Sequence, residues 1–151
     1  MARHFLLVLH YTAHRSLACG RNPLRLVRIM GRMPTDFRDG KTFPRRGRQA
    51  EGDALWLLRV ADKGRASAAG TIHDYIYPCP MDKGMMERWR ITVDEFDDAL
   101  QRNRTDELLY AWFTGRVRPE HVQEANEWLL SERLENLDRQ DSEEVAIAEP
   151  R

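Results

Sequence analysis

Cysteine is scarce in this chain, which has only Cys19 and Cys79 among its 151 residues. Two cysteines far apart in a sequence make neither a zinc-binding framework nor a disulfide-stabilised scaffold. Cys79 lies between Pro78 and Pro80, a setting typical of a turn. We therefore expect two free thiols, in a chain that is long enough to bury a substantial apolar core as one domain.

Long apolar runs are also missing. The longest covers residues 5–9, far short of the roughly 20 residues that span a bilayer. The N-terminus lacks the longer apolar stretch and the small-residue cleavage site of a signal peptide. We therefore expect no membrane partner, and a protein located in the cytoplasm or in a particle assembled there, such as a virion.

Lysine is nearly absent, because 21 of the 24 basic residues are arginine. The net charge is zero, yet residues 1–70 hold 14 basic against 5 acidic residues, and residues 71–151 hold 10 against 19. The overall balance argues against a dedicated nucleic-acid-binding protein, although the basic half could contact a polyanion locally. The alternative is that the two halves fold together and neutralise each other.

Several catalytic motifs are absent as well. The sequence contains no Gly-x-Ser-x-Gly nucleophile elbow, no glycine-rich phosphate loop and no His-Glu-x-x-His zinc motif. A function that depends on one of these motifs is therefore not indicated.

What is present predicts a mostly helical α+β fold. Residues 5–9 and 24–30 are predicted as two short strands or extended segments, and residues 31–52 as irregular, because a Gly or Pro recurs every few positions. Apolar residues spaced by three and four then predict four or five helices, at 53–64, 66–77, 93–104, 105–115 and 119–137. Pro78 and Pro80 end the helix at 66–77, so residues 78–91 are predicted as a loop.

Local signals mark some of these boundaries. Thr92 precedes Glu95 by three residues, the form of a capping box, and Pro119 suits a first helical turn. The small residues within 66–70 predict close approach to a neighbouring helix. We expect one globular domain, residues 1–138, and a disordered acidic tail, residues 139–151, whose deletion would leave the melting temperature nearly unchanged.

His73 and Asp74 are adjacent titratable residues within an apolar, aromatic segment. On a helix their side chains would point about 100° apart and could not bond to each other. Each would then meet groups from elsewhere in the chain. Asp36, Asp94 and Asp97 are the acids that we expect nearby, because they lie beside apolar anchors.

This set of residues leaves three interpretations open. In the first, His73, Asp74 and Asp36 hold a divalent metal, or together with Asp94 they activate water for catalysis. In the second, His73 is a structural residue that bonds a backbone carbonyl, while Asp74 caps the loop after Pro78. In the third, the residues serve a binding role. The cofactor therefore stays open, with a divalent metal as the candidate.

The most basic point of the chain is Arg45-Arg46-Gly47-Arg48. Arginine offers a planar fork of donors that suits phosphate or carboxylate. Arg45, Arg46 and Arg48 are therefore candidate binding residues, and nucleic acid is a candidate partner for them. The alternative is an ordinary solvated loop.

Five short segments, at residues 35–37, 43–45, 70–77, 93–94 and 108–111, together resemble a phage and prophage family, domain of unknown function 1353. Gly70–Tyr77 resembles its His-Asp-Tyr-Leu-Tyr core. Thr35-Asp36-Phe37 with Phe43-Pro44-Arg45 is similar to its earlier Thr-Asp-Phe-Ala-Ser-Ile-Pro-Arg segment, although the spacing here is three residues longer. Val93-Asp94 and Leu108–Ala111 resemble its later segments, so that the resemblance covers residues 30–117.

This resemblance implies a phage or prophage origin and a cluster formed by Asp36, His73, Asp74 and Asp94, but no established activity. We therefore expect an accessory or virion-associated protein that acts by binding a protein partner, from the phage particle or the host. The alternative is a metal-assisted hydrolase that uses His73 with Asp36, Asp74 or Asp94.

Overall fold

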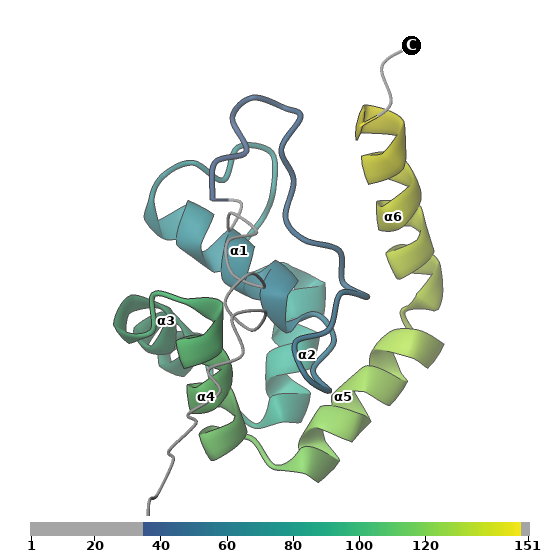
Figure 1. Cartoon of the computed structure of the whole chain (residues 1–151). Coiled ribbons are helices and arrows are strands. Elements are labelled where there is room, and N and C mark those ends of the chain that lie inside the picture. The colour runs from purple at the N-terminus through teal and green to yellow at the C-terminus, as the bar shows by residue number, and fades with distance from the viewer. Residues whose placement is uncertain (1–34, 149–151) are drawn as a thin grey trace, which may run out of the picture. The chain divides into compact units, whose positions relative to one another are not determined.

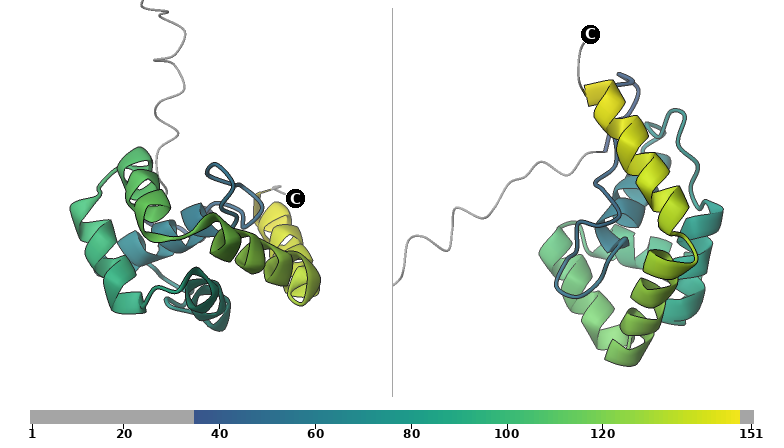
Figure 2. Two further views of the ribbon diagram at one scale, coloured as in Figure 1. Left: turned by 90° about the horizontal axis from the view of Figure 1, so that it is seen from below. Right: turned by 90° about the vertical axis from the view of Figure 1, so that its right-hand side faces the viewer.

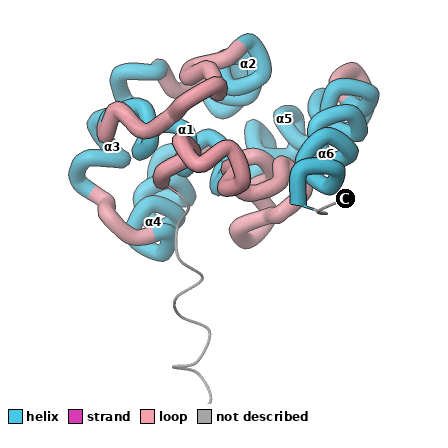
Figure 3. The backbone as a smooth tube through the Cα atoms, turned by 90° about the horizontal axis from the view of Figure 1, so that it is seen from above, coloured by secondary structure: helices cyan, strands magenta, loops and turns pink. Residues whose placement is uncertain are grey.

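The structure is a computed structural model that describes residues 35–148, and this range contains six helices and no strand (Figure 3). The helices are α1 (Leu57–Ala68), α2 (Pro80–Trp89), α3 (Val93–Arg102), α4 (Asp106–Arg116), α5 (Pro119–Ser131) and α6 (Leu134–Ala148). The nearest approach to sheet pairing among these residues is an isolated bridge between Glu51 and Ala54.

The predicted α+β class is therefore wrong for the described part of the chain, which is helical. The two segments predicted as strands, residues 5–9 and 24–30, lie outside the described residues. Residues 35–52 are irregular, as their glycines and prolines predicted, but the helix predicted from residue 53 begins only at Leu57. The helices that follow belong to one compact unit of the chain.

Two helix starts with local signals, those at Thr92 and Pro119, were predicted correctly, whereas the start predicted at Asp53 was wrong. Thr92 Oγ1 accepts a hydrogen bond from the Glu95 backbone N–H at 3.1 Å, and Glu95 accepts one from the Thr92 N–H at 2.8 Å. This capping box begins α3. Pro119 occupies the first turn of α5, where the missing N–H of proline costs no helical hydrogen bond.

The helix predicted at 66–77 ends at Ala68 instead, and residues 69–79 form a loop. Gly70 and His73 have left-handed backbone angles, with φ of 69° and 53°, so the helix cannot continue through them. The loop is also held from outside: Phe37 N–H donates to Thr71 O at 2.9 Å, and the Thr71 hydroxyl donates to Thr35 O. These contacts with a distant segment outweigh the helical spacing.

The loop predicted at 78–91 contains helix α2. Pro80 begins this helix rather than ending one, and the Asp82 carboxylate accepts from the Cys79 backbone N–H at 2.9 Å to close the first turn. The buried side chains Met81, Met85 and Trp89 recur at intervals of four on its inner face. The apolar spacing was present in the sequence, but the prolines obscured it.

Each helix contributes apolar side chains to one core. The close helix pairs are α2 with α5, α1 with α3, α3 with α4, and α5 with α6 (Figures 1 and 2). A Cβ atom on Gly84 would lie 2.3 Å from Cη2 of Trp128, so α2 and α5 approach each other there at the distance that glycine permits. The largest fully buried side chains of this core include Trp56, Trp89, Phe96, Phe113, Leu129 and Leu137.

The chain continues as helix α6 through Ala148, where the sequence predicted a disordered tail from residue 139. This helix follows α5 after a short turn and runs beside the irregular segment that contains Arg48 (Figures 1 and 2). The expectation that deletion of residues 139–151 leaves the melting temperature nearly unchanged assumed a disordered tail, whereas residues 139–148 are helical. None of the described helices is long and apolar enough to cross a membrane.

Candidate functional site

His73 and Asp74 lie on the loop between α1 and α2, near the surface. The His73 side chain is 43% exposed and that of Asp74 is 90% exposed. Their side chains do contact each other, with 3.2 Å between His73 Nε2 and Asp74 Oδ2. The expectation that they could not bond assumed a helix, and the left-handed backbone of His73 removes that restriction.

The acids expected near His73 are engaged elsewhere or face solvent. Asp36 pairs with Arg38 two residues along at 2.6 Å, and the hydrogen bonds from Arg38 lower the pKa of Asp36 to about 2. Asp94 is exposed in the first turn of α3. Asp97 accepts a hydrogen bond from the Tyr77 hydroxyl at 2.5 Å. Within residues 35–148, no group of three or more His, Cys, Asp or Glu side chains is placed to hold a metal ion.

Replacing His73 with alanine should change the free energy of unfolding by less than about 0.5 kcal/mol, since the ring is partly exposed and its one ion pair within residues 35–148 is with an exposed carboxylate. Thermal and urea unfolding of the two proteins would measure the difference. A loss of several kcal/mol would instead show that the imidazole has a buried partner.

Arg45, predicted as a binding residue, lies at the centre of an internal ionic cluster. It donates to Asp62 from Nε at 2.8 Å, from Nη2 at 2.6 Å and from its backbone N–H at 2.9 Å. It also donates to Asp106 from Nη1 at 2.5 Å. Asp106 Oδ1 also accepts a hydrogen bond from a second arginine, from Arg65 Nη1 at 2.8 Å. These contacts join the irregular segment, α1 and the start of α4.

The pKa values of the two acids in this cluster move in opposite directions. Asp62 is fully buried, and burial raises its pKa although Arg45 opposes the shift. Burial also acts to raise the pKa of Asp106, but hydrogen bonds from Arg45 and Arg65 outweigh it and hold that pKa below its usual value. The two arginines of the cluster are therefore matched by two aspartates, and the donors of the Arg45 guanidinium are engaged inside the protein rather than available to an external phosphate.

The other two predicted arginines differ from each other. Arg48 pairs with Asp138 and Asp141 of α6, so its role in this structure is to hold that helix. Arg46 is exposed to solvent. Of the three arginines predicted as a binding point, Arg46 alone is presented freely to solvent.

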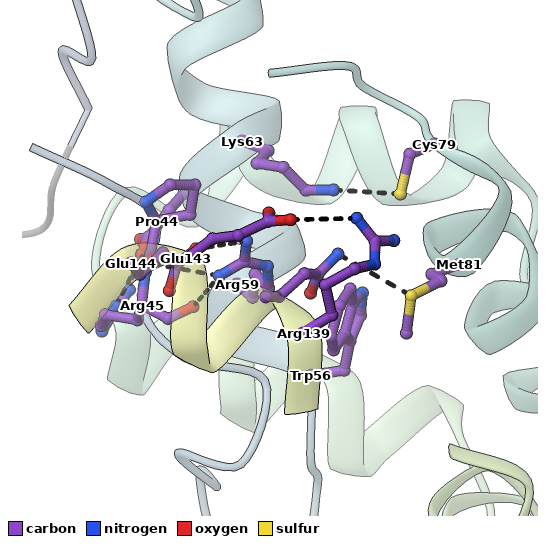
Figure 4. A network of polar contacts seen from close by, with 12 residues as sticks. Pro44, Arg45, Trp56, Arg59, Lys63, Cys79, Met81, Arg139, Glu143 and Glu144 are labelled. Carbon is purple, nitrogen blue, oxygen red and sulfur yellow. Dashed lines mark hydrogen bonds and ion pairs between the residues drawn. The ribbon is translucent and has the colours of Figure 1, made fainter. Parts of the chain in front are cut away.

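A second buried polar network, which the sequence did not indicate, surrounds Lys63; Figure 4 shows its contact with Cys79. Lys63 Nζ lies 2.6 Å from Asp82 Oδ2 and 3.2 Å from Cys79 Sγ. Asp82, which is fully buried, also accepts from Trp56 Nε1 at 2.9 Å. The network therefore connects α1 to the first turn of α2, and Asp82 serves as the acceptor for a buried charge and a buried indole.

The candidate ligand site is a cleft of about 670 Å³ between the end of α1 and α3. This volume lies within the range of small-molecule sites. The described residues that line it come from α1 and its end, from the following loop and from α3 and its end; they are Gly64, Arg65, Ser67, Ala68, Ala69, Tyr77, Asp97, Leu100, Gln101 and Arg104.

The cleft lies next to a point of close contact between α1 and α3. A Cβ atom on Gly64 would lie 2.4 Å from Leu100 Cδ1 and 3.1 Å from the Tyr77 ring, so α1 and α3 are in close contact there. Beyond this contact, Ser67, Ala68 and Ala69 are too small to fill the space. The small residues that predicted close helix approach therefore line an opening instead.

Charged groups of both signs line the cleft. Arg65 spends one nitrogen on Asp106, while its buried Nη2 has no hydrogen-bond partner among the described residues. Arg104 is exposed after the end of α3. Burial, and next the hydrogen bond to Asp97, raise the pKa of Tyr77, so that its hydroxyl stays protonated and donates to that carboxylate. The cleft therefore presents the exposed Arg104 guanidinium, and the buried Arg65 Nη2 without a partner among the described residues, beside an apolar wall.

Sequence reasoning missed this site because its residues are mostly small or arginine and lie far apart in the chain. No single segment of the sequence carries a pattern for it. The signal that was available, the small residues near the end of α1, indicated where space would arise but not which side chains would border it.

Comparison with known families corrects the resemblance given above. A comparison with curated proteins gives no match. The family model that matches the chain is the domain of unknown function DUF5069, over residues 41–150. That range contains all six helices and every described residue of the cleft but excludes Asp36. Assignment to domain of unknown function 1353 is therefore wrong, and the phage origin inferred from it loses its basis; the chain belongs to the DUF5069 family.

Proposed function

We propose that the protein binds a small organic acid, a carboxylate attached to an apolar body, in the cleft between α1 and α3. The supporting observation is that the cleft places two arginines, Arg65 and Arg104, beside an apolar wall. The ligand carboxylate would accept hydrogen bonds from these guanidinium groups, which suit carboxylates in geometry and charge.

The unpaired guanidinium at the cleft favours an anion. Arg104 is exposed and has no ion pair among the described residues, whereas Arg65 is already paired with Asp106 and the negative charge of Asp97 is engaged by the Tyr77 hydroxyl. The apolar body of the ligand would rest on Ala68 and Leu100. A ligand cation of the same shape would meet the positive charge of Arg104, which disfavours it.

The test compares three ligands of one shape: hexanoate, hexylamine and hexanol. In a titration followed by amide NMR spectra, hexanoate should shift the resonances of residues 64–69 and 97–104, with a Kd on the order of 1 mM for a ligand of this size. Hexylamine should not shift them, and hexanol should do so more weakly. Equal responses to hexanoate and hexylamine would contradict the proposed anion site.

Two substitutions test the location. Ala68→Trp should fill the cleft and abolish the hexanoate shifts, whereas Ala111→Trp, at an exposed alanine of α4, should leave them unchanged. Arg104→Gln should weaken hexanoate binding by about tenfold, the loss of one charge-assisted contact. Arg102→Gln is the matched control, because Arg102 is 76% exposed and pairs with Asp98.

A further inference from the structure

The inner face of α6 is polar for a helix that covers a protein core. Its inward positions recur at three and four and are occupied by Leu137, Gln140, Asp141 and Glu144. Leu137 is fully buried, while Leu134 and Val145 remain 39% and 38% exposed. A helix that is integral to a core presents a continuous apolar stripe. Among the described side chains of α6, the inward-facing positions hold one leucine and three polar residues instead of such a stripe.

Ion pairs hold α6 in position. Arg48 donates to Asp138 and Asp141 at the surface. Deeper in, Arg59 Nη2 donates to Glu144 Oε1 at 2.6 Å, and both side chains are more than nine-tenths buried (Figure 4). Arg59 also donates to the backbone oxygens of Pro44 and Arg45.

The polar atoms of this contact are incompletely paired. Arg59 Nε, Gln140 Oε1 and Glu144 Oε2 are buried and have no hydrogen-bond partner among the described residues. The Gln140 amide nitrogen reaches only a sulfur, that of Met81, at 3.9 Å. Buried polar groups in stable interiors are normally paired. The α6 contact is therefore less well satisfied than an optimised internal contact.

The surface beneath α6 has the composition of a binding interface. The Arg59 guanidinium lies 5.4 Å from the ring centre of Trp56 and 5.9 Å from that of Tyr75. Lys63 lies 5.8 Å from the Trp56 ring, and Met81 borders the same face. Tryptophan, tyrosine and arginine are the residues that contribute most to protein–protein affinity.

We propose that this face of α1 and α2 is a docking site for an acidic helical segment of a partner protein, and that α6 is its resident, displaceable occupant. The α6 sequence defines what fits: a leucine followed seven residues later by a carboxylate, which enters between Arg59 and its aromatic neighbours, with further acids facing Arg48. This site is separate from the cleft, and the two proposals do not depend on each other.

The binding test uses the full-length protein and a fluorescein-labelled peptide with the sequence of residues 134–148. In the Glu144→Gln variant the protein's own α6 lacks the carboxylate to which Arg59 donates, while the peptide carries that carboxylate. By fluorescence anisotropy, the peptide should bind this variant at least tenfold more tightly than it binds the unchanged protein. A peptide with Gln at the position of Glu144 should not show this preference.

The matched control is Glu143→Gln, because Glu143 is 59% exposed and its one ion pair in the described part of the chain is with Arg139 on the same helix. It should bind the peptide as weakly as the unchanged protein does. Equal peptide affinities for the two variants would overturn the proposal. Dimer formation by the unchanged protein, measured by light scattering, would also overturn it, because the occupant would then be α6 of a second copy.

Hydrogen exchange of the unchanged protein gives a test that needs no variant. The α6 amides should exchange at least tenfold faster than those of residues 125–129 in α5, and faster still at high salt, which screens the Arg48 pairs. Protection of α6 equal to that of α5 would show an integral helix and would rule out displacement.

Discussion

Replacing Asp82 with alanine should lower the free energy of unfolding by about 3–5 kcal/mol, the cost of leaving a buried charge without its partner. Asp82 is fully buried and accepts hydrogen bonds from Lys63 Nζ, Trp56 Nε1 and the Cys79 N–H. Its removal takes the acceptor from Trp56 Nε1 and the Cys79 N–H, and leaves the buried Lys63 ammonium with a sulfur and a backbone oxygen in place of a carboxylate. Urea unfolding at neutral pH would measure the loss.

Two further variants make this result interpretable. Asp98→Ala removes an aspartate that is 62% exposed on α3 and should change stability by less than about 0.5 kcal/mol. Combining Asp82→Leu with Lys63→Met replaces the charged pair by apolar groups and should recover much of the loss. A loss below about 1 kcal/mol for Asp82→Ala would mean that the Lys63 ammonium reaches solvent when its partner is absent.

Replacing Arg45 with methionine should destabilise the protein by a similar amount, about 3–5 kcal/mol near neutral pH. The side chain of Asp62 is fully buried and receives two hydrogen bonds from the Arg45 guanidinium. Without that group, the Asp62 carboxylate keeps only the backbone N–H of residue 45. The matched control is Arg46→Met, at the adjacent exposed arginine, and should have almost no effect.

This second variant should also show a characteristic dependence on pH. Burial already raises the pKa of Asp62 in the folded protein, and removing Arg45 should raise it further. A carboxyl whose pKa is higher in the folded than in the unfolded state favours folding below its unfolded pKa, about 3.9, and loses that contribution as the pH rises through the folded pKa. The deficit of Arg45→Met should therefore be smallest in acid and grow toward neutral pH. A deficit independent of pH would contradict a buried, ionised Asp62.

The parts of the fold that were predictable from sequence are those with local signals. The capping residues Thr92 and Glu95 and the helix-starting Pro119 lie next to the elements that they define, so three or four residues suffice to identify a boundary. In contrast, the end of α1 at Ala68 depends on contacts between the loop at Thr71 and the distant residues Thr35 and Phe37. A spacing rule applied to residues 66–77 alone could not include them.

The proline at position 80 illustrates a different limit. Proline ends a helix when it occurs inside one, but it also suits the first turn of the next helix. The Asp82 side chain decides between these outcomes, because it closes the first turn of α2 while accepting the Lys63 ammonium from α1. The local signal was therefore ambiguous, and a long-range pair resolves it.

The candidate site was the least predictable part. His73 and Asp74 were predicted as a site because they are adjacent titratable residues in an apolar segment, yet the structure places both at the surface of a loop. The cleft is lined by residues that carry no functional motif individually, such as Ala68 and Arg104. It forms because α1 and α3 bring these residues to the same opening. The distance between α1 and α3 is set by Gly64 against Leu100, which no sequence window contains together.

Asp106 accepts arginines from two places, Arg45 in the irregular segment and Arg65 at the cleft. A shared acceptor makes the effects of the two arginines interdependent, since residues of one ionic network do not act additively. In evolutionary terms we expect epistasis among these positions: the substitution tolerated at Arg65 should depend on the residue at position 45, which shares its acceptor. Variants selected for altered ligand preference at Arg65 would thus be expected to carry a compensating change at Arg45 or Asp106.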